Sequence, residues 1–214
     1  MKLGRSEAII ALVLVLFFLT GVYFYPQMPE MIASHWNARG QADDYMSRFW
    51  GLFLLPVISL GLTLLLMIAP RIDPLKANIG QFKRYYDLFV IVLLLFMFYL
   101  YLLTIFWNLG FRFNMVQLLV PGFSVLFYII GEVMQKARRN WFIGIRTPWT
   151  MSSDRVWDAT HQLGGRLFKA GAVISLLGIL FQRYAIFFVI GPAVLVAVFT
   201  MVYSYLEYRK EARI

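Results

Sequence analysis

The sequence contains no cysteine and carries little charge. Without cysteine there are no disulfides and no thiolate metal ligands. Charged residues make up only 14% of the 214 residues, compared with about 25% in an ordinary soluble domain. Hydrophobic residues make up 61% and aromatic residues 18%, and the mean hydropathy is +0.70. These values indicate an integral membrane protein and exclude an ordinary soluble domain.

Acidic residues are also scarce. The chain has 20 Lys and Arg but only 11 Asp and Glu, which gives a net charge of +9. Such an excess can indicate nucleic-acid binding, but here the basic residues lie between apolar runs and form no patch on a soluble fold. We therefore predict contact with membrane lipid and no direct contact with nucleic acid.

Six apolar runs reach, or nearly reach, the roughly 20 residues that a helix needs to cross about 30 Å of hydrocarbon. The first resembles a signal peptide but lacks a small-residue cleavage site, so we expect it to be retained. The sequence thus predicts an all-α polytopic membrane protein, a single membrane domain over residues 1–214 with six transmembrane helices. The predicted spans are Glu7–Tyr25, Phe49–Ala69, Tyr86–Trp107, Met115–Val133, Leu167–Phe181 and Tyr184–Leu206.

The basic residues predict the orientation. Fifteen of the 20 Lys and Arg fall in the two terminal segments and in the second and fourth connections, while the other three connections carry four. Because basic residues concentrate on the cytoplasmic side of a membrane, we expect both termini and residues 135–166 in the cytoplasm. Residues 26–48 are then an extracytoplasmic loop, and the chain spans the cell membrane several times.

The predicted cytoplasmic segment is unusually rich in Arg, Trp and paired Gly. Ser152 or Ser153 is a plausible N-cap for a short helix from about Asp154 to Leu163, which the Gly pair would end. Arg and Trp are common anchors of protein interfaces. The alternative is that the arginines only bind anionic headgroups and the tryptophans lie in the aromatic belt. The candidate partner-binding residues are Gly144, Arg146, Thr147, Pro148, Trp149, Asp154, Trp157, Asp158, His161, Gly164, Gly165 and Arg166.

Asp158 and His161 share one helical face, and the carboxylate could orient the imidazole for general-base chemistry. With Asp154 or Glu132 they could also bind a divalent ion. However, the spacing is not a strong metal-binding signature, and no nucleophile lies beside the base. The sequence therefore favours a structural histidine in a protein that is not an enzyme and has neither cofactor nor metal.

The extracytoplasmic loop has its own polar cluster. Asn37 to Gly40 is typical of a turn, and the histidine and carboxylates could bind a metal ion or a cationic peptide. Ordinary loop polarity is the alternative. The candidate ligand-binding residues are His35, Trp36, Asn37, Gly40, Asp43 and Asp44.

Two motifs carry a resemblance to a known family. One is His35-Trp36-Asn37 followed by Gly40 and Asp43, and the longer one runs from Asn140 through "FIGIRTPWT" and Val156-Trp157 to Thr160-His161 and "GGR". With these motifs the chain resembles the SdpI family of bacterial membrane immunity proteins, which act against a secreted cannibalism toxin.

The resemblance implies six helices, immunity to a membrane-active peptide toxin, and sequestration of a small cytoplasmic DNA-binding repressor at the inner loop. We therefore expect an immunity or sensor protein. A small-solute or peptide transporter is the first alternative, although the irregular pair Gly191-Pro192 has no charge beside it. A membrane-embedded metal-dependent hydrolase is the second.

Overall fold

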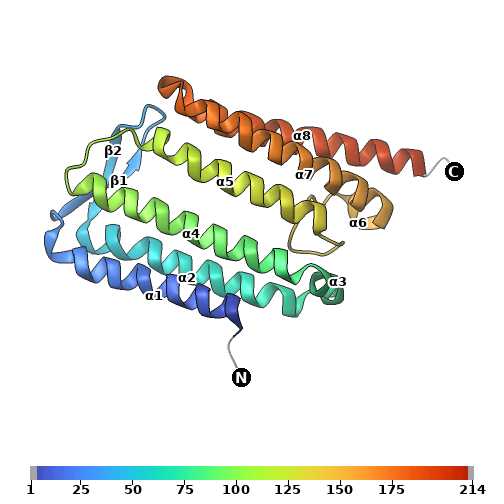
Figure 1. Cartoon of the computed structure of the whole chain (residues 1–214), viewed down its shortest axis with the longest axis horizontal. Helices are drawn as coiled ribbons and strands as arrows, with labels where there is room; N and C mark the ends of the chain where they lie inside the picture. Colours follow the sequence, from blue (N-terminus) through green and yellow to red (C-terminus); the bar gives the residue numbers. More distant parts are fainter. Residues whose placement is uncertain (1–3, 212–214) are drawn as a thin grey trace.

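The computed structural model describes residues 4–211 and consists mainly of long helices that run side by side between two ends (Figure 1). The long helices are α1 (Arg5–Phe24), α2 (Arg48–Ile72), α4 (Lys83–Asn108), α5 (Met115–Lys136), α7 (Asp154–Leu176) and α8 (Ala185–Glu211). The short helices are α3 (Lys76–Gln81) and α6 (Pro148–Ser152), and single 3-10 turns cover Tyr25–Gln27, Leu177–Ile179 and Gln182–Tyr184.

The helical membrane fold predicted from the apolar runs is confirmed, with one small exception. Residues 26–48 contain a two-stranded antiparallel hairpin, β1 (Met31–Trp36) and β2 (Ala42–Ser47), which the sequence did not predict. Of the described helices, α1, α2, α4, α5 and α8 are long and apolar enough to cross a membrane. Helix α7 covers part of the predicted fifth span but is too polar to belong to this group, so a sixth crossing remains a prediction.

The two ends of the bundle differ. The hairpin lies at one end, which we call the outer end, while α3 and α6 lie at the other, which we call the inner end (Figure 1). The start of α1 and the end of α8 also lie at the inner end. That the inner end faces the cytoplasm stays a prediction.

Helix α7 corrects one prediction. We expected Gly164-Gly165 to end a short helix, but α7 continues through both residues to Leu176. A Cβ atom on Gly165 would lie 2.6 Å from the carbonyl oxygen of Gly131 in α5, and a Cβ on Gly131 would lie 2.6 Å from the carbonyl oxygen of Gly165. These glycines therefore permit close contact between two helix backbones, as small residues do in membrane bundles.

An ion pair joins the same two helices. Lys169 of α7 places its ammonium 2.5 Å from the Glu132 carboxylate of α5 and donates a hydrogen bond to the side chain of Gln135 at 2.9 Å. Glu132 directly follows Gly131 in the sequence, and Gln135 and Lys169 lie one turn beyond the two contacting glycines. These contacts therefore fix the end of α5 against α7, next to the connection that follows α5.

Candidate functional site

The connection between α5 and α6 folds around Asn140, whose side chain is completely buried. Its amide nitrogen donates to the carbonyls of Arg138 and Ile143, and its oxygen accepts from the backbone N–H groups of Phe142 and Ile143. A buried polar side chain is stable only when its hydrogen bonds are satisfied. Asn140 thus fixes the turn, although it was only part of the quoted motif and not a predicted site residue.

His161 and Trp157 form the centre of the inner site. Their rings stack with centroids 3.8 Å apart, and both side chains are almost fully buried. The Trp157 indole donates to the carbonyl of Ala137 at 2.9 Å. His161 donates from Nδ1 to the Trp157 carbonyl at 2.8 Å and accepts from the backbone N–H of Ile145 at 2.9 Å.

These contacts show why a histidine is required. With both ring nitrogens engaged, the side chain is a neutral imidazole that donates from Nδ1 and accepts at Nε2. Burial lowers the pKa of His161 from 6.5 to about 4, and the hydrogen bond to Trp157 only partly offsets this effect. His161 therefore stays neutral at physiological pH and has no free nitrogen for a substrate.

Gly144 lies directly over the histidine ring. Its φ angle is +121°, a conformation that is costly for other residues. A Cβ atom here would also lie 2.3 Å from Nε2 of His161 and 3.0 Å from the Trp157 ring. Glycine is therefore required for both the backbone conformation and the close approach.

Helix α6 begins with a capping box. Thr147 accepts from the backbone N–H of Thr150, and Thr150 in turn accepts from the backbone N–H of Thr147. The Thr147 hydroxyl also lies 3.0 Å from that of Ser204 in α8. Trp149 packs against Tyr205, with ring centroids 5.0 Å apart. The α6 turn is thus bound to the last helix.

Four ion pairs hold the start of α7, where Ser153 caps the helix as predicted. Arg138 and Arg139, which precede α6, pair with Asp158 at 3.0 Å and Asp154 at 2.8 Å. On the other side, Arg155 pairs with Glu207 of α8 at 3.4 Å and with Glu211 at 3.7 Å. The predicted carboxylates of Asp154 and Asp158 therefore each form an ion pair with an arginine.

Residues outside the motif also contribute. Buried Asp73, which follows α2, accepts from the backbone N–H of Trp141 at 2.9 Å. Asn78 in α3 donates to the carbonyl of Arg139 at 2.8 Å. Sequence reasoning missed both residues, although a lone Asp-Pro pair directly after an apolar run was an available signal for a turn.

Within residues 4–211, the side chains considered for catalysis or metal binding at the inner end are already engaged. No group of three or more His, Cys, Asp and Glu side chains in this range is placed to hold a metal ion. Asp158 pairs with an arginine, Glu132 pairs with Lys169, and His161 is enclosed. These side chains therefore act within the fold of the inner site.

Of the twelve predicted inner residues, Asp154 and Asp158 pair with arginines and Gly144 contacts His161. The other nine fall into two groups. Trp157, His161, Gly164 and Gly165 are buried and hold the fold together. The second group reaches solvent: Trp149 and Thr147 partly, and Arg146, Pro148 and Arg166 more fully. We call this second group the inner surface.

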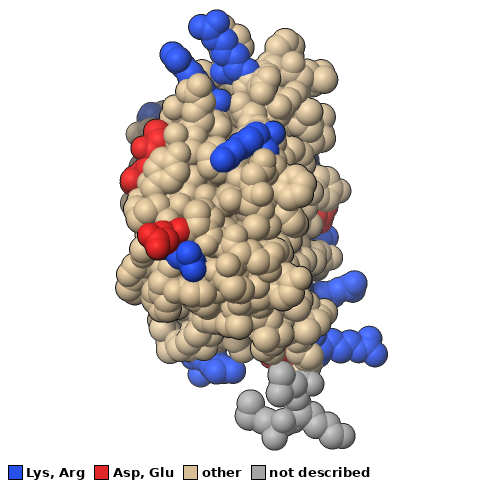
Figure 2. Space-filling model, turned by 90° about the vertical axis from the view of Figure 1, so that its left-hand side faces the viewer, with Lys and Arg blue, Asp and Glu red and all other residues tan. Residues whose placement is uncertain are grey.

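The outer end carries the hairpin. Figure 2 shows this end of the molecule, whose surface is mostly uncharged with scattered acidic and basic side chains. His35 lies 2.6 Å from the Asp43 carboxylate, and both side chains are exposed. The turn predicted at Asn37–Gly40 is confirmed, because the Gly40 N–H donates to the Asn37 carbonyl at 2.8 Å and Gly40 has a φ of +76°. Asp44 accepts only from the backbone N–H of Tyr45.

Two asparagines that the sequence analysis did not select anchor the hairpin. Asn108, at the end of α4, accepts from the backbone N–H of Ala33 at 2.7 Å and donates to its carbonyl at 3.1 Å. Asn114, before α5, donates to the carbonyl of Arg39 at 2.8 Å. The side-chain amides thus make hydrogen bonds to the hairpin backbone that a neighbouring strand would otherwise make. The spacing of residues in the sequence does not indicate such long-range pairs.

An aromatic cluster lies beside these anchors. Trp36 packs edge-on against Trp107, with centroids 5.5 Å apart, and the Arg112 guanidinium lies 3.8 Å from the centre of the Trp107 ring. Of the predicted outer residues, the structure therefore brings His35 and Asp43 together. Trp36 faces the end of α4 instead.

Known proteins are similar in sequence to both the inner site and the outer hairpin. Residues 136–204 match the model of the SdpI/YfhL protein family. The chain is also 29% identical over 209 residues to "Immunity protein SdpI" of Bacillus subtilis (strain 168), an alignment that covers 96% of this chain and 97% of that protein. The predicted resemblance to the SdpI family is confirmed. With its five apolar helices, the chain is a multi-pass protein of the cell membrane.

The family match covers the inner site and most of α8, including Trp157, His161 and Ser204. Residues 12–60, which contain the outer hairpin, match a second model, described as a domain of unknown function (DUF1648). No solved structure matches the chain.

Proposed function

We propose that this chain is an immunity protein that protects the cell membrane against a membrane-active peptide. The similarity to an immunity protein along 96% of the chain carries this proposal. The membrane helices support it, because a protein that intercepts a membrane-active peptide has to lie where the peptide acts. The role requires binding and no catalysis.

The outer hairpin is the proposed contact for the peptide. His35, Asp43 and Asp44 are exposed on it, and carboxylates attract the cationic side chains common in membrane-active peptides. The asparagine anchors keep the hairpin in place against the helix ends, so these side chains stay accessible. Preorganised side chains lose less entropy when they bind.

The inner surface is the proposed contact for a cytoplasmic regulator, a small DNA-binding repressor. Arg146 and Trp149 supply a charged group and an aromatic group next to each other on a rigid turn, as interface anchors do. Signalling requires that peptide binding outside changes the affinity inside. Helix α7, which leads from the inner site along the bundle, is the proposed connection.

Protection is tested by expressing the chain in a bacterium that is sensitive to a membrane-active cationic peptide and measuring survival. We expect higher survival than with the empty vector, at equal growth before exposure. Equal survival against every peptide to which the host is sensitive, with the protein present in the membrane, would contradict the proposal.

Variants then separate the two ends. Asp43→Asn together with Asp44→Asn should reduce protection, whereas Glu30→Gln, an exposed carboxylate outside the strands at the same end, should not. If the two substitutions leave survival unchanged, the hairpin is not the contact.

Arg146→Ala should release a membrane-recruited regulator while leaving protection intact, and Arg84→Ala serves as an exposed control at the inner end. The regulator is sought in the neighbouring reading frames, tagged with a fluorescent protein and followed by microscopy. If no such frame encodes a DNA-binding protein that moves to the membrane, this part of the proposal fails and only protection stands.

A further inference from the structure

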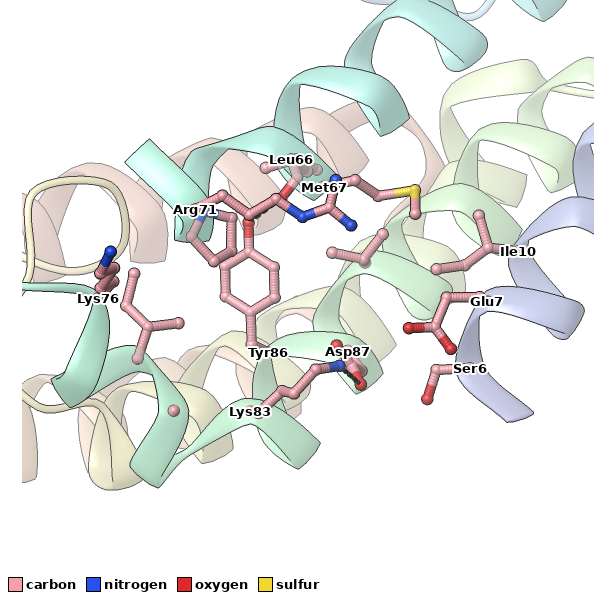
Figure 3. Close-up of a pocket in the computed structure, with 14 residues that line it drawn as sticks. Ser6, Glu7, Ile10, Leu66, Met67, Arg71, Lys76, Lys83, Tyr86 and Asp87 are labelled. Carbon is pink, nitrogen blue, oxygen red and sulfur yellow. Dashed lines mark hydrogen bonds and ion pairs between the residues drawn. The ribbon is translucent and has the colours of Figure 1, made fainter. Parts of the chain in front are cut away.

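A second inner-end feature lies away from the inner surface. A pocket of about 260 Å³ opens between α1, α2, α3 and α4 (Figure 3). It combines an apolar wall with charged groups from all four helices, and neither family motif contains its charged residues. Neither the immunity role nor regulator binding accounts for it.

The charged groups have an unusual arrangement. In Figure 3, Arg71 near the end of α2 and Glu7 in the first turn of α1 project into the pocket from opposite sides. Within residues 4–211, no hydrogen bond or ion pair joins these two side chains to each other or to another residue. A guanidinium and a carboxylate that face one pocket without pairing are complementary to a ligand that carries both charges.

Three further polar groups of the pocket are already engaged, whereas Lys76 of α3 and Ser6 of α1 line it without a side-chain partner among residues 4–211. Lys83 pairs with Asp87 at 2.6 Å, which leaves little net charge at that wall. The Tyr86 hydroxyl donates to the carbonyl of Leu66 at 2.5 Å. These contacts shape the pocket but leave Arg71, Lys76 and Glu7 as the charged groups available to a ligand.

The apolar wall is suited to a hydrocarbon chain. Ile10, Leu66 and Val90 line it, and they lie one turn deeper in the bundle than the charged residues. In the predicted orientation, the charged groups are at the level of the inner headgroups and the apolar groups at the level of the acyl chains. Basic pockets between helices on the cytoplasmic side are known lipid-binding sites.

We propose that this pocket binds one phospholipid whose headgroup carries an amine, such as phosphatidylethanolamine. Arg71 binds the phosphate, Glu7 binds the ammonium group, and one acyl chain lies against Ile10, Leu66 and Val90. A headgroup without an amine leaves Glu7 without a partner, and a free phosphate leaves the apolar wall uncovered. The bound lipid would join α1 to α2 and α4.

The test uses the purified full chain in detergent and native mass spectrometry. Phosphatidylethanolamine and phosphatidylglycerol with identical acyl chains are titrated separately. We expect one molecule of phosphatidylethanolamine to be retained, and more strongly than phosphatidylglycerol. Arg71→Gln should weaken binding of both lipids about tenfold, since a hydrogen bond to a charged group contributes about 1.5 kcal/mol or more.

Glu7→Gln should weaken phosphatidylethanolamine alone and so remove the preference. Arg84→Gln, an exposed arginine at the same end, is the matched control and should bind like the parent. Equal lipid binding by Arg71→Gln and the parent would overturn the site, and a preference for phosphatidylglycerol would overturn the role of Glu7. Competition by soluble glycerophosphoethanolamine at the same concentration as lipid would overturn the acyl contact.

A thermal melt in lipid-free detergent separates ligand binding from a direct pair. If both variants melt at lower temperature than the parent while lipid binding is unchanged, Arg71 and Glu7 pair with each other and the proposal is wrong. The result is independent of protection against peptides, which is measured in cells.

Discussion

The inner site and the outer hairpin both consist of polar residues beside apolar helices, but they are stabilised in opposite ways. At the inner end, Asn140 and His161 are buried and their hydrogen bonds are satisfied by backbone groups. At the outer end, His35 and Asp43 are exposed, and the hairpin is held from outside by Asn108. The same residue types therefore serve as structural core at one end and as accessible surface at the other.

This difference shows that a dense polar motif does not by itself mark a contact surface. Much of the longer inner motif is required for its own folding, because each buried polar group needs a particular partner. The shorter outer motif constrains only a turn. Substitutions at the inner end should therefore change stability first, and substitutions at the outer end should change binding first.

The largest expected effect is that of Trp157→Ala. Removing this buried ring leaves a cavity, ends the stacking on His161 and frees the carbonyl of Ala137, which should cost about 4 kcal/mol. Hydrogen–deuterium exchange measured by mass spectrometry should show faster exchange in residues 137–161. Exchange in residues 31–47 should not change.

Trp141→Ala is the control for this prediction, because Trp141 is 51% exposed. It should leave exchange in both regions close to that of the parent. Equal exchange in Trp157→Ala and Trp141→Ala would mean that the inner end does not depend on its buried ring.

The next effect is acid sensitivity confined to the inner end. Because the fold lowers the pKa of His161 from 6.5 to about 4, the unfolded segment binds a proton more readily than the folded one. Stability is therefore fully present above pH 6.5 and is lost as the pH falls toward 4, by about 3 kcal/mol in total. Limited proteolysis at pH 7 and pH 5 should show cleavage in residues 137–161 increasing at the lower pH.

His161→Gln separates this effect from titration of the carboxylates. Glutamine can donate and accept hydrogen bonds but does not titrate in this range. The variant should be less stable than the parent at pH 7, with a smaller change between pH 7 and pH 5. An equally large change in both proteins would assign the acid sensitivity to another group.

The smallest of the three effects is expected at the outer end. Asn108→Ala leaves the backbone N–H and carbonyl of buried Ala33 without their partners, at a cost of about 2 kcal/mol. Exchange should increase in residues 31–47 and remain unchanged in the inner site.

His35→Ala is the comparison, because an exposed ion pair contributes less than about 1 kcal/mol. It should leave exchange in the hairpin nearly unchanged. Should His35→Ala destabilise the hairpin more than Asn108→Ala, the outer end would be held by its own surface, and the contrast between the two ends would disappear.

Much of this architecture could be predicted from sequence because it depends on local pattern. Apolar length predicted the five long apolar helices, and Asn37 to Gly40 predicted a turn that the structure contains. Ser153 was expected near the start of α7 and caps it. Each of these features depends on residues within a few positions of one another.

The errors came from contacts between distant segments. Gly164-Gly165 looked like a helix end because the nearby backbone of Gly131 is not visible in a local pattern. The hairpin was missed for a similar reason, since Asn108 satisfies one strand from about 75 positions away. The ion pair between Lys169 and Glu132 likewise joins two residues that no local pattern connects. Long-range pairing therefore explains what the sequence alone could not predict.

The contacts of α8 with the inner turn have a consequence for synthesis. The ribosome makes the inner turn about 55 residues before it makes Ser204, Glu207 and Glu211, the side chains that close over that turn. The earlier helices of a nascent chain therefore enter the membrane before α8 contacts this turn. The surface formed by Arg146 and Trp149 becomes complete only when translation reaches the last turns of α8, so a product cut short before Ser204 would remain in the membrane without the contacts that fix this surface.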